Sequence, residues 1–440
     1  MIERIAENGV VGAGGAGFPT AVKLRASADT FLVNGAECEP LMHKDKELLL
    51  HYGREMLTGL AIGMECVGAT RGIIGVKEKY ASVIEALQAM VPSNVTLFPL
   101  RDTYPAGDEF ILVYDVLGKI IPPGGLPLDV GAVVSNVETL VNIGLGRPVT
   151  HKFLTVAGAV AEPVTLRVPV GISFGELIEA AGGATVDSFG VLLNGAMMGR
   201  EVTSLEEPVT KTTGGLIVLP EEHRLVDRYR KTYDEVSAIG RSACDQCSFC
   251  TELCPRYLIG HPIEPHKAMR ALGFAPDKDA WIAGTLYCCE CNLCSLYSCP
   301  EDLDPRDICA HSKPVARERD LGWKGNVEEL RAHPVEDGRR VPIRRLMTKL
   351  GLDEFRNVGP LVERSLMPER VTLPVQQHLG APCRPVVKVG DRVSVGDVIA
   401  APQPDALGVN IHASIDGVVE RVGDTIVLVA DSLARGGERG

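Results

Sequence analysis

Cysteine is the residue type whose spacing says most about chemistry in this chain. Of 13 cysteines, nine lie between Cys244 and Cys299. The first run has the spacing C-x2-C-x2-C-x3-C followed by proline, which is typical of a bacterial [4Fe–4S] ferredoxin. A second run repeats this spacing with one extra residue before its last cysteine. Thiolates are the soft ligands that such clusters need, so we expect two [4Fe–4S] clusters held by Cys244, Cys247, Cys250, Cys254, Cys288, Cys291, Cys294 and Cys299.

The two runs are expected to exchange their last ligands. In two-cluster ferredoxins the fourth cysteine of each run binds the other cluster, so Cys299 would complete the first site and Cys254 the second. Cys289 leaves an ambiguity, because it could replace Cys288, although the even spacing would then be lost. Zinc is the disfavoured alternative, since zinc sites usually use two C-x2-C pairs. We expect buried thiols at the cysteines outside the runs, Cys38, Cys66, Cys309 and Cys383.

The composition is that of a core-forming, multidomain protein. A chain of 440 residues predicts about two to four domains, with 45% hydrophobic and 23% charged residues. The net charge of −12 argues against a nucleic-acid partner. The sequence shows no signal-peptide pattern and no run of 18 apolar residues, so we expect no transmembrane segment. Clustered cysteines in such a chain indicate a reducing compartment, and we expect a cytoplasmic protein.

A glycine-rich loop, GVVGAGGAGFPT, lies near the start of the chain. It contains the pattern G-x-G-x-x-G at Gly12, Gly14 and Gly17. A dinucleotide-binding turn requires a strand before these glycines, but the preceding residues are too few and too charged to form one. We therefore expect the loop to precede the first strand of a sheet. Its bare backbone can still approach a phosphate or a flat ring closely, and a helix beginning near Pro19 would favour an anion.

Strands and helices are expected to alternate after this loop. Such alternation implies a mostly parallel sheet with helices on its faces. Apolar periodicity predicts strands over 31–35, 71–76 and 95–100, and helices over 44–63 and 77–90.

Four motifs, in this order, carry a resemblance to a known family: GAGGAGFPTAVK (12–23), NGAECEP (34–40), YPAGDE (104–109) and SNVETL (135–140). Together they resemble the FMN- and NADH-binding fold of the flavin subunit of respiratory complex I. They are more similar to the Rnf complex C subunits and the propanediol-utilization cobalamin reductases. Complex I subunits usually carry an acidic residue where this chain has Ala36. The resemblance extends over nearly the whole chain.

The resemblance implies FMN, two [4Fe–4S] clusters and NADH as electron donor. It places the glycines and Phe18 against flavin or nucleotide and Lys23 near a phosphate. It places the remaining polar residues around the flavin. The cofactor-binding residues that it implies are Gly12, Gly14, Gly15, Gly17, Phe18, Lys23, Asn34, Glu37, Glu39, Tyr104, Gly107, Glu109, Asn136 and Thr139. No side-chain acid or base is assigned, because hydride transfer between stacked rings requires none.

Each of these residues has a purely structural alternative. Asn136 and Thr139 could be helix caps. Lys23 could be a solvated helix charge, and Glu37 and Glu39 could be surface carboxylates. The two glutamates do follow an apolar strand, where α/β sheets bind ligands.

The middle of the chain is expected to contain a β-rich module and a helical connector. Residues 151–206 resemble a β-grasp soluble-ligand-binding domain. Met197 and Met198 are interpreted as core residues rather than ligands. Residues 227–240 are expected to form a charged helical connector. Periodicity does not decide the apolar segment 109–121, and the resemblance favours a helix there.

The C-terminal region contains an internal half-repeat, VKVGDRVSVGDVIA and GVVERVGDTIVLVA, at 387–400 and 417–430. Short strands with Val-Gly-Asp turns resemble a lipoyl-type barrel-sandwich hybrid. Lipoyl carriers need an exposed lysine on a hairpin, and residues 402–414 contain none. We therefore expect a structural or docking module. Rnf C subunits carry this module near the N-terminus, so its C-terminal position favours the cobalamin reductase arrangement.

The expected fold class is multidomain α/β and α+β. The expected domains are a Rossmann-like FMN/NADH-binding domain (1–150), the β-grasp module (151–206), a connector (207–240), a helical ferredoxin-like two-[4Fe–4S] domain (241–320), a second connector (321–370) and the barrel-sandwich hybrid (371–440).

The expected function is that of an oxidoreductase carrying electrons from NADH through FMN and the clusters to oxidised cobalamin, in propanediol utilization. The resemblance implies an adenosyltransferase and microcompartment shell proteins as partners, and a location within a bacterial microcompartment. One alternative is an Rnf-type C subunit, an NADH:ferredoxin oxidoreductase module of a membrane complex. Another is a non-enzymatic iron–sulfur carrier whose flavin site has lapsed.

Overall fold

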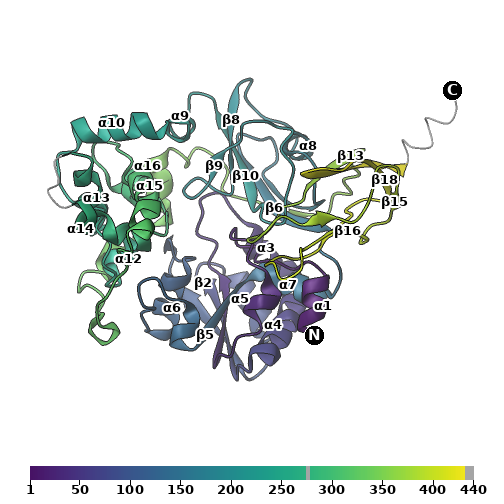
Figure 1. The fold of residues 1–440 in the computed structure, drawn as a ribbon, viewed down its shortest axis with the longest axis horizontal. Helices are drawn as coiled ribbons and strands as arrows, with labels where there is room; N and C mark the ends of the chain where they lie inside the picture. Colours follow the sequence, from purple (N-terminus) through teal and green to yellow (C-terminus); the bar gives the residue numbers. More distant parts are fainter. Residues whose placement is uncertain (274–277, 432–440) are drawn as a thin grey trace.

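The computed structural model describes residues 1–273 and 278–431. It contains a parallel α/β domain, a mixed β-sheet domain, a helical domain and a C-terminal β domain (Figure 1). The predicted combination of α/β and α+β architecture is therefore confirmed. Within the described residues, no helix is both long and apolar enough to cross a membrane.

The N-terminal domain is built on a parallel sheet with the strand order β3-β2-β1-β5. Alternate residues of its apolar strand β1 face opposite sides: Phe31 and Val33 pack with α4 and α7, whereas Leu32 packs with α6 on the other face. Both faces are covered, as expected for parallel strands. The elements are α1 (Ile2–Glu7), α2 (Thr20–Lys23), β1 (Thr30–Gly35), α3 (Lys44–His51), α4 (Gly53–Val67), β2 (Arg71–Lys77), α5 (Ala81–Gln88), β3 (Val95–Leu100), β4 (Thr103–Tyr104), α6 (Glu109–Leu117), η1 (Pro127–Val130), β5 (Ala132–Asn136) and α7 (Val137–Leu145).

One expected helix of this domain is divided, and the helix that the resemblance favoured in the undecided segment is present. The single helix expected over 44–63 is divided at Tyr52, whose φ is −120° and whose ring packs edge-on against Phe153 at 5.0 Å. The undecided segment 109–121 begins as helix α6. The Asp108 side chain caps α6 by accepting the backbone N–H groups of Phe110 and Ile111.

The second domain is a six-stranded sheet with the order β12-β7-β6-β10-β8-β9. It extends beyond residue 206, because β10 lies between β6, to which it is parallel, and β8, to which it is antiparallel. The later strand β12 pairs with β7 at the far edge. The elements are β6 (His151–Gly158), β7 (Val164–Pro169), α8 (Phe174–Ala180), β8 (Phe189–Leu193), β9 (Arg200–Glu201), β10 (Gly215–Pro220) and β12 (Leu361–Val362).

The third domain is helical and contains the cysteine runs. The expected helical connector consists of two helices, α9 and α10. A short strand beyond the helices, β11, returns to pair with β4 of the N-terminal domain. The elements are α9 (Arg224–Arg230), α10 (Tyr233–Ala243), α11 (Phe249–Glu252), α12 (Pro255–Leu258), α13 (Pro265–Ala271), α14 (Lys278–Ile282), η2 (Ala283–Tyr287), η3 (Cys294–Ser298), α15 (Pro305–Glu318), η4 (Val327–Glu329), η5 (Asp337–Arg339), β11 (Val341–Pro342) and α16 (Ile343–Leu350).

The C-terminal domain is a pair of small antiparallel sheets around a common aliphatic core. Although it ends the chain, it lies beside the N-terminal helix α1 (Figure 1). Residues 432–440 of the expected module lie outside the described residues. The strands are β13 (Arg370–Pro374), β14 (Arg384–Pro385), β15 (Arg392–Val393), β16 (Val398–Ala401), β17 (Ile411–His412), β18 (Gly417–Arg421) and β19 (Thr425–Ala430).

Lys211 of the second domain joins the N-terminal segment to the C-terminal domain. This lysine is 2% exposed, and its Nζ donates to the carbonyl oxygens of Gly9 at 2.7 Å and Asn410 at 2.8 Å. Close by, the backbone N–H of Leu379 donates to the carbonyl of Gly17 at 3.0 Å. Gly17 has a φ of +65°, and a Cβ there would lie 2.7 Å from Thr212. The C-terminal domain therefore holds the end of the glycine loop in place.

Replacing Lys211 with Met should loosen this junction. Two buried carbonyls would lose their donor, at about 1–3 kcal/mol for each unsatisfied group. We expect a lower Tm and faster amide hydrogen exchange over residues 9–17. The exposed Lys388→Met in the same C-terminal domain is the matched control. Unchanged exchange over 9–17 in Lys211→Met would contradict the role of this lysine.

Candidate functional site

The glycine loop forms an exposed backbone turn ahead of β1. It is closed by the N–H of Gly12 donating to the Phe18 carbonyl at 2.9 Å and the N–H of Gly17 donating to the Gly12 carbonyl at 3.1 Å. The loop is fixed to α7 because the Ala13 N–H donates to Thr139 Oγ1 at 2.9 Å. A Cβ at Gly15 would meet no atom of the described residues within 4 Å. The turn thus presents bare backbone to open space, which suits close approach of a flat ring or a phosphate.

Beside this loop, charged and amide side chains gather at the carboxyl ends of β1 and β5. Lys23 Nζ donates to the Val134 carbonyl at 2.9 Å and lies 3.3 Å from Glu109 Oε1. Asn34 Nδ2 donates to the Gly107 carbonyl at 2.8 Å. One cation and several hydrogen-bonding groups therefore lie at the edge where parallel sheets bind their ligands. This set fits an anionic, ring-bearing cofactor such as FMN.

Asn136 and Glu37 meet through Asp45. Asn136 caps α7 by accepting the N–H of Glu138 at 2.9 Å, and its Nδ2 donates to Asp45 Oδ2 at 2.7 Å. Glu37 in turn accepts the backbone N–H of Asp45 at 2.8 Å. The capping role considered as an alternative for Asn136 is thus present. Because the Asn136 side chain also lies beside Gly14, capping fixes it next to the glycine loop.

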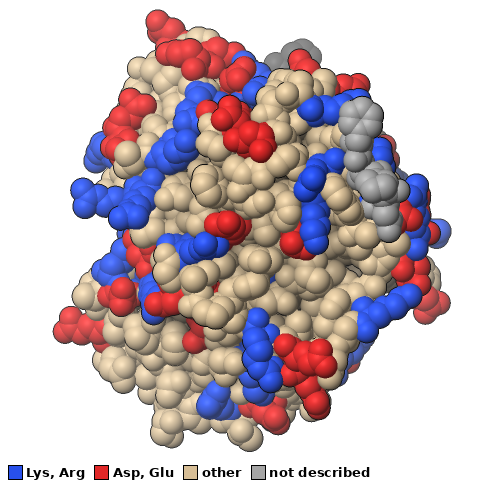
Figure 2. Space-filling model, turned by 90° about the vertical axis from the view of Figure 1, so that its left-hand side faces the viewer, with Lys and Arg blue, Asp and Glu red and all other residues tan. Residues whose placement is uncertain are grey.

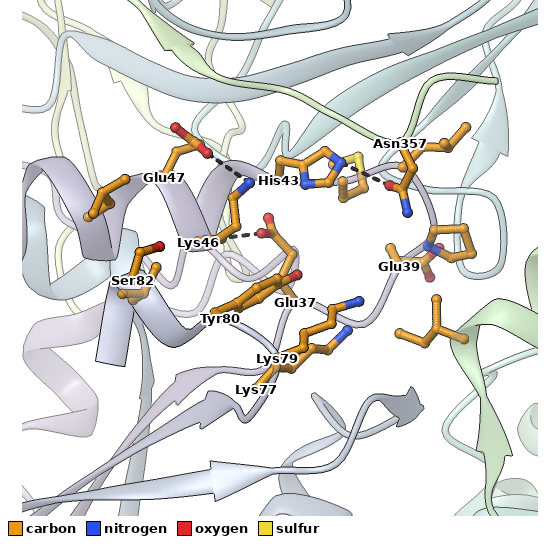
Figure 3. Close-up of a pocket in the computed structure, with 16 residues that line it drawn as sticks. Glu37, Glu39, His43, Lys46, Glu47, Lys77, Lys79, Tyr80, Ser82 and Asn357 are labelled. Carbon is orange, nitrogen blue, oxygen red and sulfur yellow. Dashed lines mark hydrogen bonds and ion pairs between the residues drawn. The ribbon is translucent and has the colours of Figure 1, made fainter. Parts of the chain in front are cut away.

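Glu37 and Glu39 also line a pocket of about 330 Å³. In Figure 3, Glu37, Tyr80 and two lysines gather on one side of the pocket, with His43 and Asn357 across from them. Burial, and then the nearby Asp45 charge, raise the pKa of Glu37 to about 7. Sequence reasoning missed most of the other polar side chains here, which include His43, Lys46, Lys77, Lys79, Tyr80 and Asn357.

Lys77 is the missed residue that the sequence could have indicated. It ends the apolar strand β2 as Glu37 follows β1, and the ends of neighbouring parallel strands lie at the same sheet edge. Its Nζ lies 2.8 Å from Asp102 Oδ1, and Lys79 lies 2.7 Å from the other oxygen of that carboxylate. His43 Nε2 donates to Asn357 Oδ1 at 2.9 Å, and burial lowers the His43 pKa to about 4. Nothing in the local sequence connects His43 with Asn357, 314 residues away.

Glu39 and Tyr104 connect the pocket to the cysteine runs. Glu39 accepts the backbone N–H groups of Met197 at 2.9 Å and Met198 at 3.0 Å. The Tyr104 hydroxyl donates to the Cys291 carbonyl at 2.8 Å and lies 3.4 Å from Glu39 Oε1. Met197 is buried, as predicted. The same prediction is wrong for Met198, which is 53% exposed, because the turn directs its N–H toward Glu39 and its side chain outward.

A second contact joins the same two domains. Arg256, directly after the Cys-Pro end of the first run, pairs with Asp108 at 2.7 Å. Its guanidinium also lies 3.6 Å from the centre of the Phe110 ring. His261 Nε2 lies 2.8 Å from the carbonyl oxygen of Ile121. Helix α6 and the residues that flank it therefore form part of the surface on which the helical domain docks.

The structure brings the cysteines of the first expected set together. Burial, and then the neighbouring thiols of Cys244, Cys247 and Cys299, raise the pKa of Cys250 to about 12. Cys299 from the second run thus lies with the first run, as the exchange of ligands requires. A raised thiol pKa describes the side chains without metal, and metal binding displaces their protons.

The second set forms around Cys254. A small cavity there is lined by this cysteine together with Cys288, Cys289, Cys291 and Cys294. Burial, followed by Cys289 and Cys288, raises the pKa of the Cys254 thiol. Both candidates for the ambiguous ligand therefore face the same site. Across the described ranges, no group of three or more His, Cys, Asp or Glu side chains is arranged so that it could hold a single metal ion. Two sets of soft thiols fit iron–sulfur clusters in donor chemistry.

Comparison with known proteins identifies four families along the chain. Residues 5–145 match the Nuo51 FMN-binding domain and residues 153–201 the SLBB domain. Residues 243–304 match a 4Fe-4S dicluster domain and residues 359–434 the RnfC barrel sandwich hybrid domain. The chain thus combines an FMN-binding domain with a two-cluster iron–sulfur domain, which defines a flavin and iron–sulfur protein.

The chain is 43% identical over 432 residues to the cobalamin reductase PduS of Salmonella typhimurium, covering 97% of this chain and 95% of that protein. PduS of Citrobacter freundii is also 43% identical, over 434 residues, with the same coverage. The chain therefore belongs to the PduS cobalamin reductase family. The predicted family is confirmed.

More distant similarity covers part of the chain. The C subunit of the proton-translocating ferredoxin:NAD(+) oxidoreductase complex of Clostridium ljungdahlii is 32% identical over 268 residues, covering 59% of this chain and 56% of that protein. Among solved structures, a chain of NAD+-reducing [NiFe]-hydrogenase in the H2-reduced state has a TM-score of 0.48 and 21% identity. That match covers 74% of this chain and 63% of the hydrogenase chain.

Burial of Glu39 makes stability depend on pH. Burial raises the pKa of Glu39 from 4.5 to about 7, so the folded protein holds a proton that the unfolded chain has released. The corresponding stability is fully present below pH 4.5 and is lost as pH rises through 7, by roughly 3 kcal/mol in all. The Tm of wild type should therefore fall between pH 5 and pH 8 relative to that of Glu39→Gln. The exposed Glu65→Gln should run parallel to wild type. A parallel profile for Glu39→Gln would show that this carboxyl does not titrate there.

Proposed function

We propose that this protein is an NADH-dependent oxidoreductase that transfers electrons from NADH to oxidised cobalamin. When bound, FMN would accept a two-electron hydride and release electrons singly, and the clusters would carry single electrons onward. The names of the PduS relatives support cobalamin as the acceptor. The observation that carries the proposal is the 2.8 Å hydrogen bond from Tyr104 of the candidate flavin site to the carbonyl of Cys291.

The chain's own residues would bind and orient the cofactors. The glycine loop, Lys23 and Asn136 would hold FMN, with Asn34, Glu109 and the two pocket glutamates around it. The site containing Cys254 and Cys291 adjoins the flavin side through Tyr104. The other site includes Cys247, which is solvent-exposed. We therefore assign electron entry to the Cys254 site.

The biological setting is part of the same proposal. The resemblance to the propanediol-utilization cobalamin reductases supports delivery of reduced cobalamin to an adenosyltransferase. It also supports a location inside a bacterial microcompartment, among shell proteins. NADH is proposed as the donor on the same resemblance.

The direct test is anaerobic purification followed by flavin and iron analysis and an assay of NADH-dependent reduction of hydroxocobalamin. Ferredoxin and quinone analogues are assayed beside it. We expect bound flavin, iron–sulfur absorbance and cobalamin reduction. Rapid ferredoxin reduction without cobalamin reduction would favour the Rnf-type alternative. Brown protein without flavin or NADH oxidation would favour the non-enzymatic carrier.

Replacing Cys247 with Ala should remove one cluster and leave the flavin bound. Cys247 is exposed and distant in sequence from the flavin motifs, so the α/β domain should fold unchanged. We expect iron content to fall by about half, with flavin content as in wild type. Cys66→Ala, which removes a thiol outside both runs, is the control. Unchanged iron in Cys247→Ala would refute the ligand assignment.

A further inference from the structure

A second cavity, separate from the candidate flavin site, lies where the β-sheet domain meets the helical domain. Its volume is about 260 Å³, and its walls come from β9, α9, α15 and the loop of the second cysteine run. Its basic and amide lining includes Arg200, Arg228, Lys231, Asn292, Arg306 and His311. We call it the Arg228 cavity.

Arg228 and Arg306 line this cavity, and each pairs with an aspartate that also lines it, Arg228 with Asp304 and Arg306 with Asp307. Arg228 is 8% exposed; its Nη2 donates to the Leu303 carbonyl at 3.0 Å and also pairs with Asp304. Across the described ranges, neither its buried Nε nor the buried Nε of Arg306 has a hydrogen-bond partner. Lys231 forms no ion pair with any other described residue. Buried donors without acceptors are costly, so the two guanidinium groups keep hydrogen-bonding capacity beyond their aspartate partners, and Lys231 adds a cation without a carboxylate partner among the described residues.

The cavity also adjoins the second cysteine run. Asn292 follows Cys291 directly, and its Nδ2 donates to the Met197 carbonyl at 3.1 Å. The backbone N–H of Arg306 donates to Ser295 Oγ at 3.0 Å, next to Cys294. A molecule in the cavity would therefore touch the loop that carries two of the proposed cluster ligands.

The outer face of the helical domain shows no concentration of positive charge that would attract an anionic molecule (Figure 2). Figure 2 shows Lys and Arg interspersed with Asp and Glu on this face, around a broad uncharged area. Recognition of an anionic molecule is better served by the enclosed guanidinium groups, because charge-assisted hydrogen bonds are stronger where water is excluded.

We propose that the Arg228 cavity binds the phosphate-bearing part of the electron acceptor. This inference rests on the proposed function, since cobalamin carries a phosphodiester in its nucleotide tail and amides around its ring. Guanidinium N–H groups are suited to phosphate oxygens, and the lining carboxylates of Glu201, Asp304 and Asp307 can accept from amide N–H groups. At 260 Å³ the cavity is smaller than pockets that enclose a whole drug-sized ligand, so the corrin ring remains outside it.

Equilibrium binding to the full chain tests this inference without relying on turnover. Hydroxocobalamin, cobinamide (which lacks the phosphodiester tail) and inorganic phosphate are titrated by calorimetry into wild type, Arg306→Gln and Lys231→Gln. Lys231→Gln removes no ion pair with a described residue and so should fold normally. Arg317→Gln, an equal charge change on an exposed part of α15, is the control.

We expect each cavity variant to weaken hydroxocobalamin binding about tenfold and to leave cobinamide binding unchanged. Inorganic phosphate should compete with hydroxocobalamin in wild type and not with cobinamide. Equal binding of hydroxocobalamin by wild type and both variants would overturn the inference, as would phosphate binding without competition. Wild type that binds hydroxocobalamin in this way and yet does not reduce it with NADH would instead refute the proposed function.

Discussion

The hydroxyl of Tyr104 is the contact on which the arrangement of the domains depends. It satisfies the Cys291 carbonyl in the helical domain while lying beside Glu39 of the α/β domain. Glu39, in turn, satisfies two backbone N–H groups of the β-sheet domain. Because buried polar groups must find partners, the three domains cannot move apart at this point without leaving several unsatisfied. In a redox protein the chain's main task is to fix the positions of its cofactors, and this contact is placed to do so.

Glu37 and Glu39 show how one short loop serves two purposes. The Glu37 carboxylate accepts the backbone N–H of Asp45 in the first turn of α3, whereas the Glu39 carboxylate accepts the backbone N–H of Met197 in the β-sheet domain. Burial raises the pKa of both carboxyls to about 7, so the charge of the pocket changes near neutral pH. Lys46, Lys77 and Lys79 line the same pocket, and their positive charge favours an anionic ligand there.

Local patterns were sufficient for the features that depend on neighbours in sequence. The spacing of the cysteines predicted two mixed ligand sets; Cys299 lies near Cys250, and the ligand assignment itself stays a prediction. Strands expected from short apolar runs appear as β1, β2 and β3. Features that depend on long-range pairing were missed: β10 enters the middle of its sheet, and His43 meets Asn357 from the far end of the chain. No local residue preference encodes such contacts, because they exist only after the domains have packed.

The contacts of the C-terminal domain with the first residues of the chain give this domain a structural role. Lys211 donates from its backbone N–H to the Gln377 side chain and from its Nζ to the carbonyl oxygens of Gly9 and Asn410. The backbone N–H of Leu379 donates to the Gly17 carbonyl. Since the first residues of the chain lie against this domain, joining it to either end would preserve the contact. The module concerned is the one over residues 359–434 that matches the RnfC barrel sandwich hybrid domain. In this chain the contact supports the glycine loop, because Lys211 and Leu379 hold the backbone of Gly9 and Gly17.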